Sequence, residues 1–354
     1  MMPTPHLPFV SILLPIRDET DTIERCLAAV LAQDYPLERL EVLIADGMSA
    51  DGTRAQLEAV SVAHPHVQVF DNPGQIVSTG LNLLTCEAHG DVLIRVDGHC
   101  AIAPDYVRNC VRRLAQDQVD VVGGPMRSIG ETFVSENISV ATSSRFGVGY
   151  SVFRTETGVT RQVDTVPFPA LTREMIAQVG LYDEELVRDQ DDEHNYRIRK
   201  AGGVVLLADE VRSDYYSRSS LCTLWRQYFG YGFWKVRVMQ KHPRQMRPRQ
   251  FVPFAFVLSL IVLTLWGLIV PGGWVPLAVF VGAYLLANLT ASILTAAQRG
   301  WRYLPLLPLA YTTLHLSYGL GFLAGLVRFI HRWGDREGKV PELPEGWENL
   351  AGTR

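Results

Sequence analysis

The chain has 354 residues, of which 47% are apolar and 20% are charged, and its formal net charge is −4. This average hides three segments of different charge. Residues 1–216 hold 32 acidic and 18 basic residues, residues 217–250 hold 8 basic and no acidic residues, and residues 251–354 hold 7 basic and 5 acidic residues. The composition excludes a disordered chain, a collagen-like chain and a strongly basic nucleic-acid binder, so no nucleic-acid partner is expected.

Charge and hydropathy together predict four regions. We expect an acidic catalytic or binding domain over residues 1–216, a basic segment over 217–250, an apolar region over 251–330 and a polar tail over 331–354. The five cysteines show no paired spacing, which favours reduced thiols. The first ten residues lack the basic and apolar parts of a signal peptide, so the first domain is expected in the cytoplasm.

The acidic domain begins with an alternation of short apolar runs and amphipathic stretches. The apolar runs predict strands at 9–15, 41–45, 67–70 and 91–96. The amphipathic stretches predict helices at 20–32, 53–63 and 80–88. This rhythm predicts an α/β domain with a Rossmann-like, mostly parallel sheet and helices on both faces. In such a sheet, ligands bind at the carboxyl ends of the strands.

Polar side chains collect at three of these predicted strand ends. Pro15, Arg17 and Glu19 follow the first strand, Asp46 follows the second, and Asp97 with His99 follows the fourth. Each cluster alone could be a turn with capping residues. The three clusters stand at the carboxyl ends of strands that are connected by helical crossovers. We therefore expect them to line one polar cleft.

The motifs in these clusters resemble the family 2 glycosyltransferases with the GT-A fold. The resemblance rests on P-x-R-D-E after the first strand, D-G-x-S-x-D-G-T after the second, D-x-H after the fourth and Q-D-D-E-x-N-Y-R-x-R-K-A-G at 190–202. Together with the Gly pair at 123–124 and three apolar C-terminal runs, these features are most similar to the succinoglycan glucosyltransferase type. Such enzymes extend sugar chains on a polyprenyl diphosphate carrier.

The resemblance implies a nucleotide-sugar site. It places the donor-binding residues at Pro15, Arg17, Glu19, Asp46 and Asp97. A carboxylate such as Asp46 can accept a hydrogen bond from a uracil ring N–H, and UDP-hexose is the expected donor. Asp51 fits a turn or helix cap instead.

The D-x-H motif implies a divalent cation. Asp97 and His99 stand at the D-x-D position of the family, where Mg²⁺ or Mn²⁺ would bridge the donor phosphates. The imidazole is a softer ligand that favours Mn²⁺. The alternative is that His99 contacts phosphate directly or is only a satisfied polar neighbour. Cys100 lacks the partners of a zinc site.

Alignment of Gly202 with the family's downstream glycine implies that Asp191 is the catalytic base, with Gln190 in place of the usual Glu. The base would deprotonate the acceptor hydroxyl, and a single in-line displacement would invert the anomeric centre. The alternative for this acidic run is a helix cap. Candidate acceptor contacts are Asp192, Arg145, Gln227 and Trp234.

The apolar region predicts a membrane anchor. Residues 252–270 and 274–297 are each long enough to cross a bilayer, and 303–327 forms a third apolar run. We expect two to four transmembrane helices, with three favoured, although the prolines and glycines of the third run also fit a broken or re-entrant element. The basic, aromatic segment before them is typical of an interfacial helix.

The combined expectation is a multi-pass inner-membrane enzyme with a cytoplasmic catalytic domain. It would transfer a hexose, with inversion, to a lipid-linked saccharide in exopolysaccharide or cell-envelope assembly. Its partners would be the nucleotide sugar, the polyprenyl diphosphate acceptor, membrane lipids and other glycan-assembly enzymes. The alternatives are a polyprenyl-phosphate sugar transferase, a processive polysaccharide synthase and a non-catalytic membrane scaffold.

Overall fold

The computed structural model describes residues 7–149, 151–156 and 158–351. The chain divides into two compact units. The first is drawn from residues 1–127, 156–215 and 338–354, and the second from residues 128–155 and 216–337. The polar motifs at residues 15–99 and 189–202 therefore belong to the first unit, and the apolar helices belong to the second.

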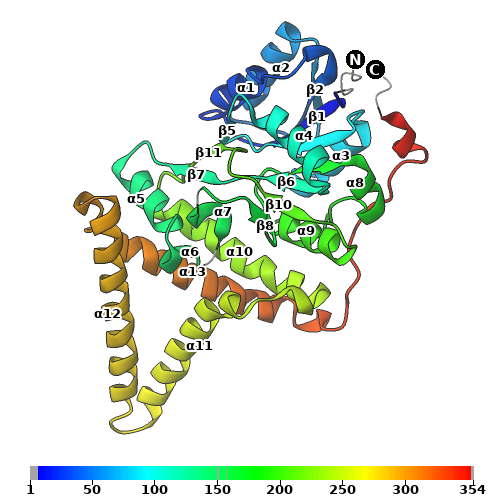
Figure 1. Cartoon of the computed structure of the whole chain (residues 1–354). Coiled ribbons are helices and arrows are strands. Elements are labelled where there is room, and N and C mark those ends of the chain that lie inside the picture. Colours follow the sequence, from blue (N-terminus) through cyan, green and yellow to red (C-terminus); the bar gives the residue numbers. More distant parts are fainter. Residues whose placement is uncertain (1–6, 150, 157, 352–354) are drawn as a thin grey trace. The chain divides into compact units, whose positions relative to one another are not determined.

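The first unit is built on an eight-stranded sheet in the order β3-β2-β1-β4-β9-β6-β10-β8 (Figure 1). Its strands are β1 (Val10–Ile16), β2 (Leu40–Asp46), β3 (Val67–Asp71), β4 (Val92–Arg95), β6 (Val121–Gly123), β8 (Arg161–Gln162), β9 (Ala170–Thr172) and β10 (Val205–Leu207). The first four pair in parallel, whereas β9 runs antiparallel to both β4 and β6. The expected α/β sheet is confirmed, and it is mixed in its second half.

A smaller sheet and several helices complete this unit. The smaller sheet has the order β5-β11-β7, from β5 (Cys100–Ile102), β11 (Ser213–Tyr216) and β7 (Met126–Ile129). The helices are α1 (Ile23–Leu31), η1 (Leu37–Arg39), α2 (Thr53–Ala63), α3 (Val77–Glu87), α4 (Tyr106–Asp117), α8 (Arg173–Val179), α9 (Gln190–Lys200) and η5 (Trp347–Leu350). Alternation of strand and helix puts the polar residues after β1, β2 and β4 at one edge of the sheet.

The glycine pair at 123–124 has a packing reason. A Cβ on Gly124 would lie 1.6 Å from the carbonyl oxygen of Val211, and one on Gly123 would lie 2.7 Å from the carbonyl oxygen of Pro167. Backbone approaches this close exclude any larger residue. The pair therefore lets the end of β6 pass against two other segments of the first unit.

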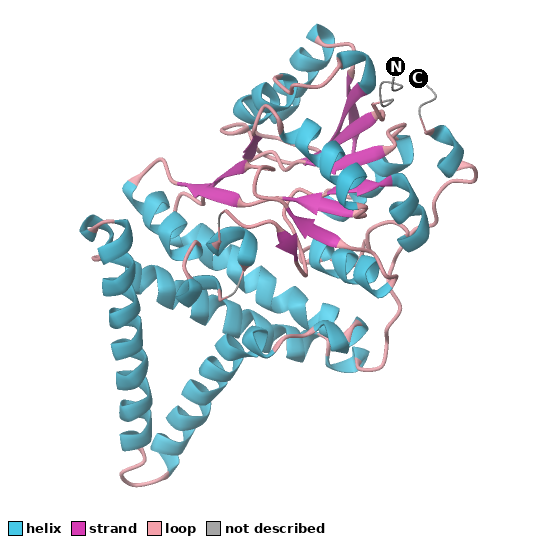
Figure 2. Ribbon diagram, in the orientation of Figure 1, coloured by secondary structure: helices cyan, strands magenta, loops and turns pink. Residues whose placement is uncertain are grey.

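The second unit is helical (Figure 2). Its elements are α5 (Phe133–Thr142), α6 (Arg145–Val148), α7 (Val152–Thr155), α10 (Leu221–Lys241), η2 (Pro243–Gln245), α11 (Pro248–Ile269), α12 (Trp274–Arg299), η3 (Trp301–Tyr303), α13 (Leu307–Arg328) and η4 (Ile330–Arg332). The two helices α11 and α12 form a hairpin around the predicted turn at 271–273 (Figure 1).

Within the described residues, α11 and α12 are the two helices long and apolar enough to span a membrane, and only 11% of the apolar window of each is buried. The third apolar run forms α13, which differs from them because it packs closely on α10. A Cβ on Gly321 would lie 2.1 Å from the carbonyl oxygen of Phe229, and one on Gly232 would lie 2.0 Å from that of Tyr318. The glycines of the third run thus serve helix–helix contact and do not break the helix.

Candidate active site

The residues predicted to contact the nucleoside lie at the ends of β1 and β2. Asp46 is buried, and its carboxylate accepts a hydrogen bond from the Ser49 N–H at 3.2 Å and pairs with Arg54 at 3.5 Å. Arg17 is exposed and donates to the Gln75 carbonyl at 3.1 Å. Pro15 is buried within β1. Asp51 accepts hydrogen bonds from the Thr53 and Thr20 N–H groups, which confirms its expected place in a turn.

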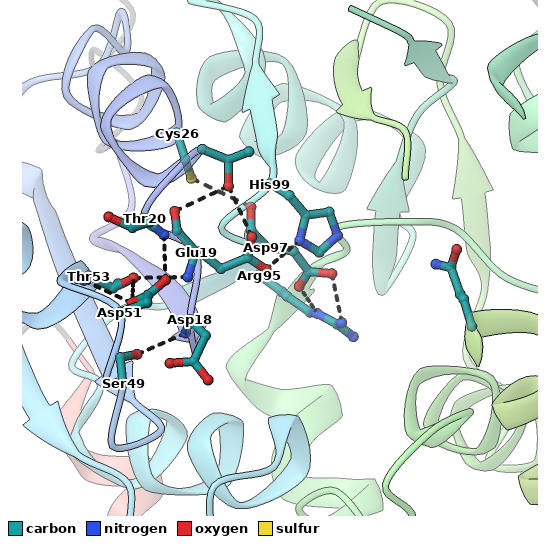
Figure 3. A network of polar contacts seen from close by, with 12 residues as sticks. Asp18, Glu19, Thr20, Cys26, Ser49, Asp51, Thr53, Arg95, Asp97 and His99 are labelled. Carbon is teal, nitrogen blue, oxygen red and sulfur yellow. Dashed lines mark hydrogen bonds and ion pairs between the residues drawn. The ribbon is translucent and has the colours of Figure 1, made fainter. Parts of the chain in front are cut away.

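Glu19 and His99 meet at the end of β4 (Figure 3). The carboxylate Oε1 of Glu19 lies 2.8 Å from Nδ1 of His99, and its Oε2 accepts from the Thr22 hydroxyl at 3.0 Å. A carboxylate on one ring nitrogen fixes the orientation of an imidazole and leaves the other nitrogen for a ligand. Glu19 thus orients the D-x-H motif, and its expected contact with the nucleoside stays a prediction.

Asp97 is held by Arg95, the last residue of β4 (Figure 3). The buried guanidinium donates from Nε to Oδ1 at 2.8 Å and from Nη2 to Oδ2 at 3.1 Å. Burial raises the pKa of Asp97, but Arg95, His99 and Arg188 lower it, and the net shift is downward. Asp97 is therefore an ionised carboxylate in a fixed orientation.

Asp191 lies in the first turn of α9 and is half-buried. One of its oxygens accepts the Asp192 N–H at 2.9 Å. Burial lowers the pKa of Arg95, but Asp97 and then Asp191 raise it above its ordinary value. The same arginine therefore interacts electrostatically with both the D-x-H carboxylate and the expected base.

One other acidic residue of this run, Glu193, has a structural ion pair. Glu193 is buried and forms an ion pair with Arg197 at 2.9 Å, and Arg197 also donates to the Leu181 carbonyl at 2.6 Å. Asp189 precedes the helix in a left-handed conformation with φ 60°. Asp192 is half-buried next to Asp191. Asp191 therefore stays the predicted base of this run, and Asp192 stays a candidate acceptor contact.

The remaining acceptor candidates lie in the second unit. Arg145 is exposed at the start of α6. Gln227 is buried on α10 and donates to the Tyr231 hydroxyl at 3.1 Å. Trp234 packs against Phe233 and Phe329, with ring centroids 5.4 and 5.6 Å apart. Their contact with an acceptor stays a prediction.

The donor atoms at the D-x-H motif fit a divalent cation that also binds phosphate. Each Asp97 oxygen accepts one hydrogen bond and keeps a second lone pair, and Nε2 of His99 is the ring nitrogen turned away from Glu19. Among the residues that the structure describes, no group of three or more His, Cys, Asp or Glu could hold a metal ion. Substrate phosphates and water would thus complete the coordination, as is usual for Mg²⁺.

Two residues of this site were missed by sequence analysis. Arg95 carries a charge within the apolar run that forms β4, and a charged residue in a buried strand is rare unless it is paired. That placement was an available signal. Arg188 is exposed and interacts electrostatically with Asp97, although the two are far apart in sequence.

Comparison with solved structures identifies the fold of this α/β domain. The chain superposes on the mannosyltransferase PcManGT from Pyrobaculum calidifontis, solved with GDP-Man and Mn²⁺, with a TM-score of 0.55 and 18% identity over 94% of this chain and 89% of that one. It also superposes on GalNAc-T7, solved with UDP, GalNAc and Mn²⁺, with a TM-score of 0.50 and 18% identity over 67% of this chain and 48% of that one. The fold is GT-A.

Sequence comparison identifies the family. Residues 11–170 match the profile described as glycosyl transferase family 2. The succinoglycan biosynthesis protein ExoA of Rhizobium meliloti (strain 1021) is 32% identical over 91% of this chain and 96% of that protein. A dolichyl N-acetyl-alpha-D-glucosaminyl phosphate 3-beta-D-2,3-diacetamido-2,3-dideoxy-beta-D-glucuronosyltransferase of Methanococcus voltae is 26% identical over 90% of this chain and 98% of that protein. The chain belongs to glycosyl transferase family 2 and is a glycosyltransferase.

Proposed function

We propose that the protein transfers a hexose from a nucleotide sugar, with UDP-hexose as the expected donor, to a lipid-linked saccharide with inversion of the anomeric centre. The observation that carries this proposal is the shared arginine: Arg95 binds Asp97 bidentately and interacts with Asp191. The carboxylate proposed to face the donor phosphates and the carboxylate proposed as the base therefore both interact with one buried arginine. The similarity to ExoA supports a role in exopolysaccharide or cell-envelope glycan synthesis.

In this proposal each side chain of the site has a separate role. Asp46 and Arg17 hold the nucleoside, and Asp97 with His99 faces the diphosphate. A divalent cation bound there, Mg²⁺ or Mn²⁺, would stabilise the negative charge of the leaving diphosphate. Asp191 accepts the proton of the acceptor hydroxyl as that oxygen attacks the anomeric carbon. A polyprenyl-phosphate acceptor needs no base and would be repelled by the acidic run at 189–193, so a hydroxyl acceptor is favoured.

We test the base with Asp191→Asn. Membranes that contain the protein are incubated with labelled UDP- and GDP-sugars, and label in the lipid fraction is measured with and without a chelator. Loss of a positioned general base is expected to lower transfer by roughly a hundredfold or more, while UDP binding stays unchanged. Glu174→Gln, at an exposed acidic residue of α8 outside the site, serves as the control. Undiminished transfer by Asp191→Asn refutes the base, and transfer in excess chelator refutes the cation.

We also propose that the protein is held in the cytoplasmic membrane by two crossings. Helices of 22 and 26 residues extend about 33 and 39 Å, enough for a hydrocarbon core of about 30 Å. Residues 338–351 belong to the first unit, which carries the predicted site, so an even number of crossings returns the chain to the side of that unit. The basic residues at both ends of α13 then lie in the cytoplasm, in agreement with the positive-inside rule.

Topology is tested by cysteine labelling in a Cys222→Ser background, since Cys222 is an exposed native cysteine. A membrane-impermeant maleimide applied to intact cells should label Gly272→Cys in the α11–α12 turn and should not label Glu342→Cys in the tail. Labelling of Glu342→Cys would mean an odd number of crossings.

A further inference from the structure

The C-terminal segment 338–350, here called the C-terminal strap, packs within the first unit beside the loop that leads to Asp191. This loop, residues 180–189, is here called the base loop, and it ends where α9 begins. The main-chain N–H of Lys339 donates to Oδ1 of Asp183 at 2.8 Å, and the N–H of Glu184 donates to the Lys339 carbonyl at 2.9 Å. The strap and the base loop thus exchange two hydrogen bonds.

Asp183 is the centre of this contact. It is 1% exposed. Its Oδ1 also accepts the Glu185 N–H at 3.0 Å, and its carbonyl accepts the Leu186 N–H at 3.1 Å. A Cβ on Gly338 would lie 2.7 Å from Oδ2 of Asp183, so the strap approaches as closely as a glycine allows. The same carboxylate therefore shapes the base loop and binds the strap.

The far end of the strap is anchored in the first unit by Trp347, which is 1% exposed. Its indole N–H donates to the Thr85 carbonyl at 2.7 Å, and its carbonyl accepts from Arg173 at 2.7 Å. The Arg173 guanidinium also lies over the indole ring, 4.0 Å from its centroid. A buried aromatic ring with a satisfied N–H and a cation on its face is a strong attachment.

The residues just before the strap are fixed within the second unit. Arg237 of α10 is fully buried and donates to the carbonyls of Asp335 at 2.7 Å and Glu337 at 3.1 Å. Within the first unit, the strap itself is held near its start by Lys339 and near its end by Trp347. A segment held at both ends and bonded to a loop restricts the conformations of that loop.

The base loop is held from its other side by α3. The amide of Asn82 donates to the Tyr182 carbonyl at 2.9 Å, and its oxygen accepts the Tyr182 N–H at 2.8 Å. The Ser78 hydroxyl donates to the Leu186 carbonyl at 3.3 Å. Beyond Leu186 the loop is exposed at Val187 and Arg188 before it enters α9. Contacts from α3 and from the strap together determine how the chain enters the helix that carries Asp191.

We propose that the C-terminal strap positions the base loop for catalysis, with Asp183 as its positioning residue. The proposal rests on the proposed role of Asp191 as the base. The strap touches no reacting group in this scheme, and it acts by holding Asp191 in place against the acceptor hydroxyl. Misplacement of a catalytic group by about 1 Å can cost roughly a hundredfold in rate. Loosening the strap should therefore reduce turnover more than donor binding.

The test uses the full-length protein with Lys339→Pro, which removes the N–H that binds Asp183. Gly338→Val is a second variant in case the first fails to fold, because its side chain displaces the strap from Asp183. Glu342→Pro is the matched control at an exposed residue of the same segment. Hydrogen exchange of residues 183–192, UDP binding and turnover with the sugar nucleotide that supports transfer are measured for each variant.

We expect faster exchange over 183–192, a turnover number lowered about tenfold or more, and UDP affinity within about twofold of the control. Unchanged exchange over 183–192 overturns the proposal, because the strap then does not hold the loop. Faster exchange with unchanged turnover also overturns it, since the contact would be only structural. The exchange measurement is independent of Asp191→Asn, so failure of the strap and failure of the base assignment are distinguishable.

Discussion

A fall in pH is predicted to loosen α9 through His194. This side chain lies three residues beyond Asp191 and is 3% exposed. Its ring stacks on Tyr182 at 4.2 Å, and its Nε2 lies 3.0 Å from the Gly180 carbonyl. Burial, with Arg197 as the next cause, lowers the pKa of His194 from 6.5 to about 3. The imidazole is therefore neutral in the folded protein and donates from Nε2.

Because the protonation of His194 is linked to folding, its lowered pKa determines how the stability of the folded protein changes with pH. Because the folded-state pKa is depressed, the stability contribution is complete above the ordinary value of 6.5 and is lost as the pH falls from there toward the folded value. At about pH 5 the unfolded state binds a proton that the folded state does not. The cost is about 2 kcal/mol, or roughly thirtyfold in the opening equilibrium.

The assay is hydrogen exchange of α9 in the wild type and in His194→Gln, at about pH 7.5 and about pH 5, corrected for intrinsic rates. Wild-type α9 should lose about thirtyfold in protection at the lower pH, and the variant should lose little. The pKa of His66 is also lowered by burial, but this residue is unchanged in the variant, so its contribution cancels. Equal pH dependence in both proteins would refute the reasoning.

Two further predictions concern single contacts. Arg95→Lys keeps the charge but cannot bind both oxygens of Asp97. Loss of one charge-assisted hydrogen bond should weaken cation-dependent UDP binding, measured by calorimetry, roughly tenfold to a hundredfold. Unchanged binding would show that the two-pronged contact of the guanidinium is not needed. Gly321→Ala places a Cβ 2.1 Å from the Phe229 carbonyl oxygen and should lower thermal stability by about 1–3 kcal/mol. Gly282→Ala, whose Cβ meets nothing within 4 Å, is the control, and equal melting temperatures for the two variants would contradict the close packing of α10 on α13.

The first half of the sheet could be predicted from sequence because its strands and helices repeat a clear pattern. The helix expected at 53–63 is α2 with the same bounds, and the four strands differ by at most one residue at each end. The second half could not be predicted in the same way. Its strands have two to three residues, as in β8 and β9, and such short runs carry no measurable periodicity. Their places depend on long-range pairing, such as Leu171 with both Leu93 and Val121.

The third apolar run shows that composition alone does not predict a membrane crossing. Residues 303–327 are apolar enough to suggest a crossing, but hydropathy does not distinguish a helix that faces lipid from one that faces another helix. The distinction lies in which residues are buried. In α13 these include Gly319, Gly321 and Gly325, whose missing side chains admit the backbones of α10 and α11. Glycine in a helix lowers helix stability by about 1 kcal/mol relative to alanine. Three glycines in one apolar helix are therefore better explained by close helix packing than by a helix that faces lipid.

The site shows the same division between local and long-range information. Carboxylates that follow apolar strands can be expected at one sheet edge, and Asp46, Asp97 and Asp191 all belong to the first unit. What fixes their geometry comes from residues outside the family motifs. Arg95 lies inside a strand, and Lys339 reaches Asp183 across 156 positions through its main chain alone. Because Lys339 makes this contact through its main chain, its side chain leaves no signal in the sequence, whereas Asp183 and Gly338 at the same contact are restricted in residue type.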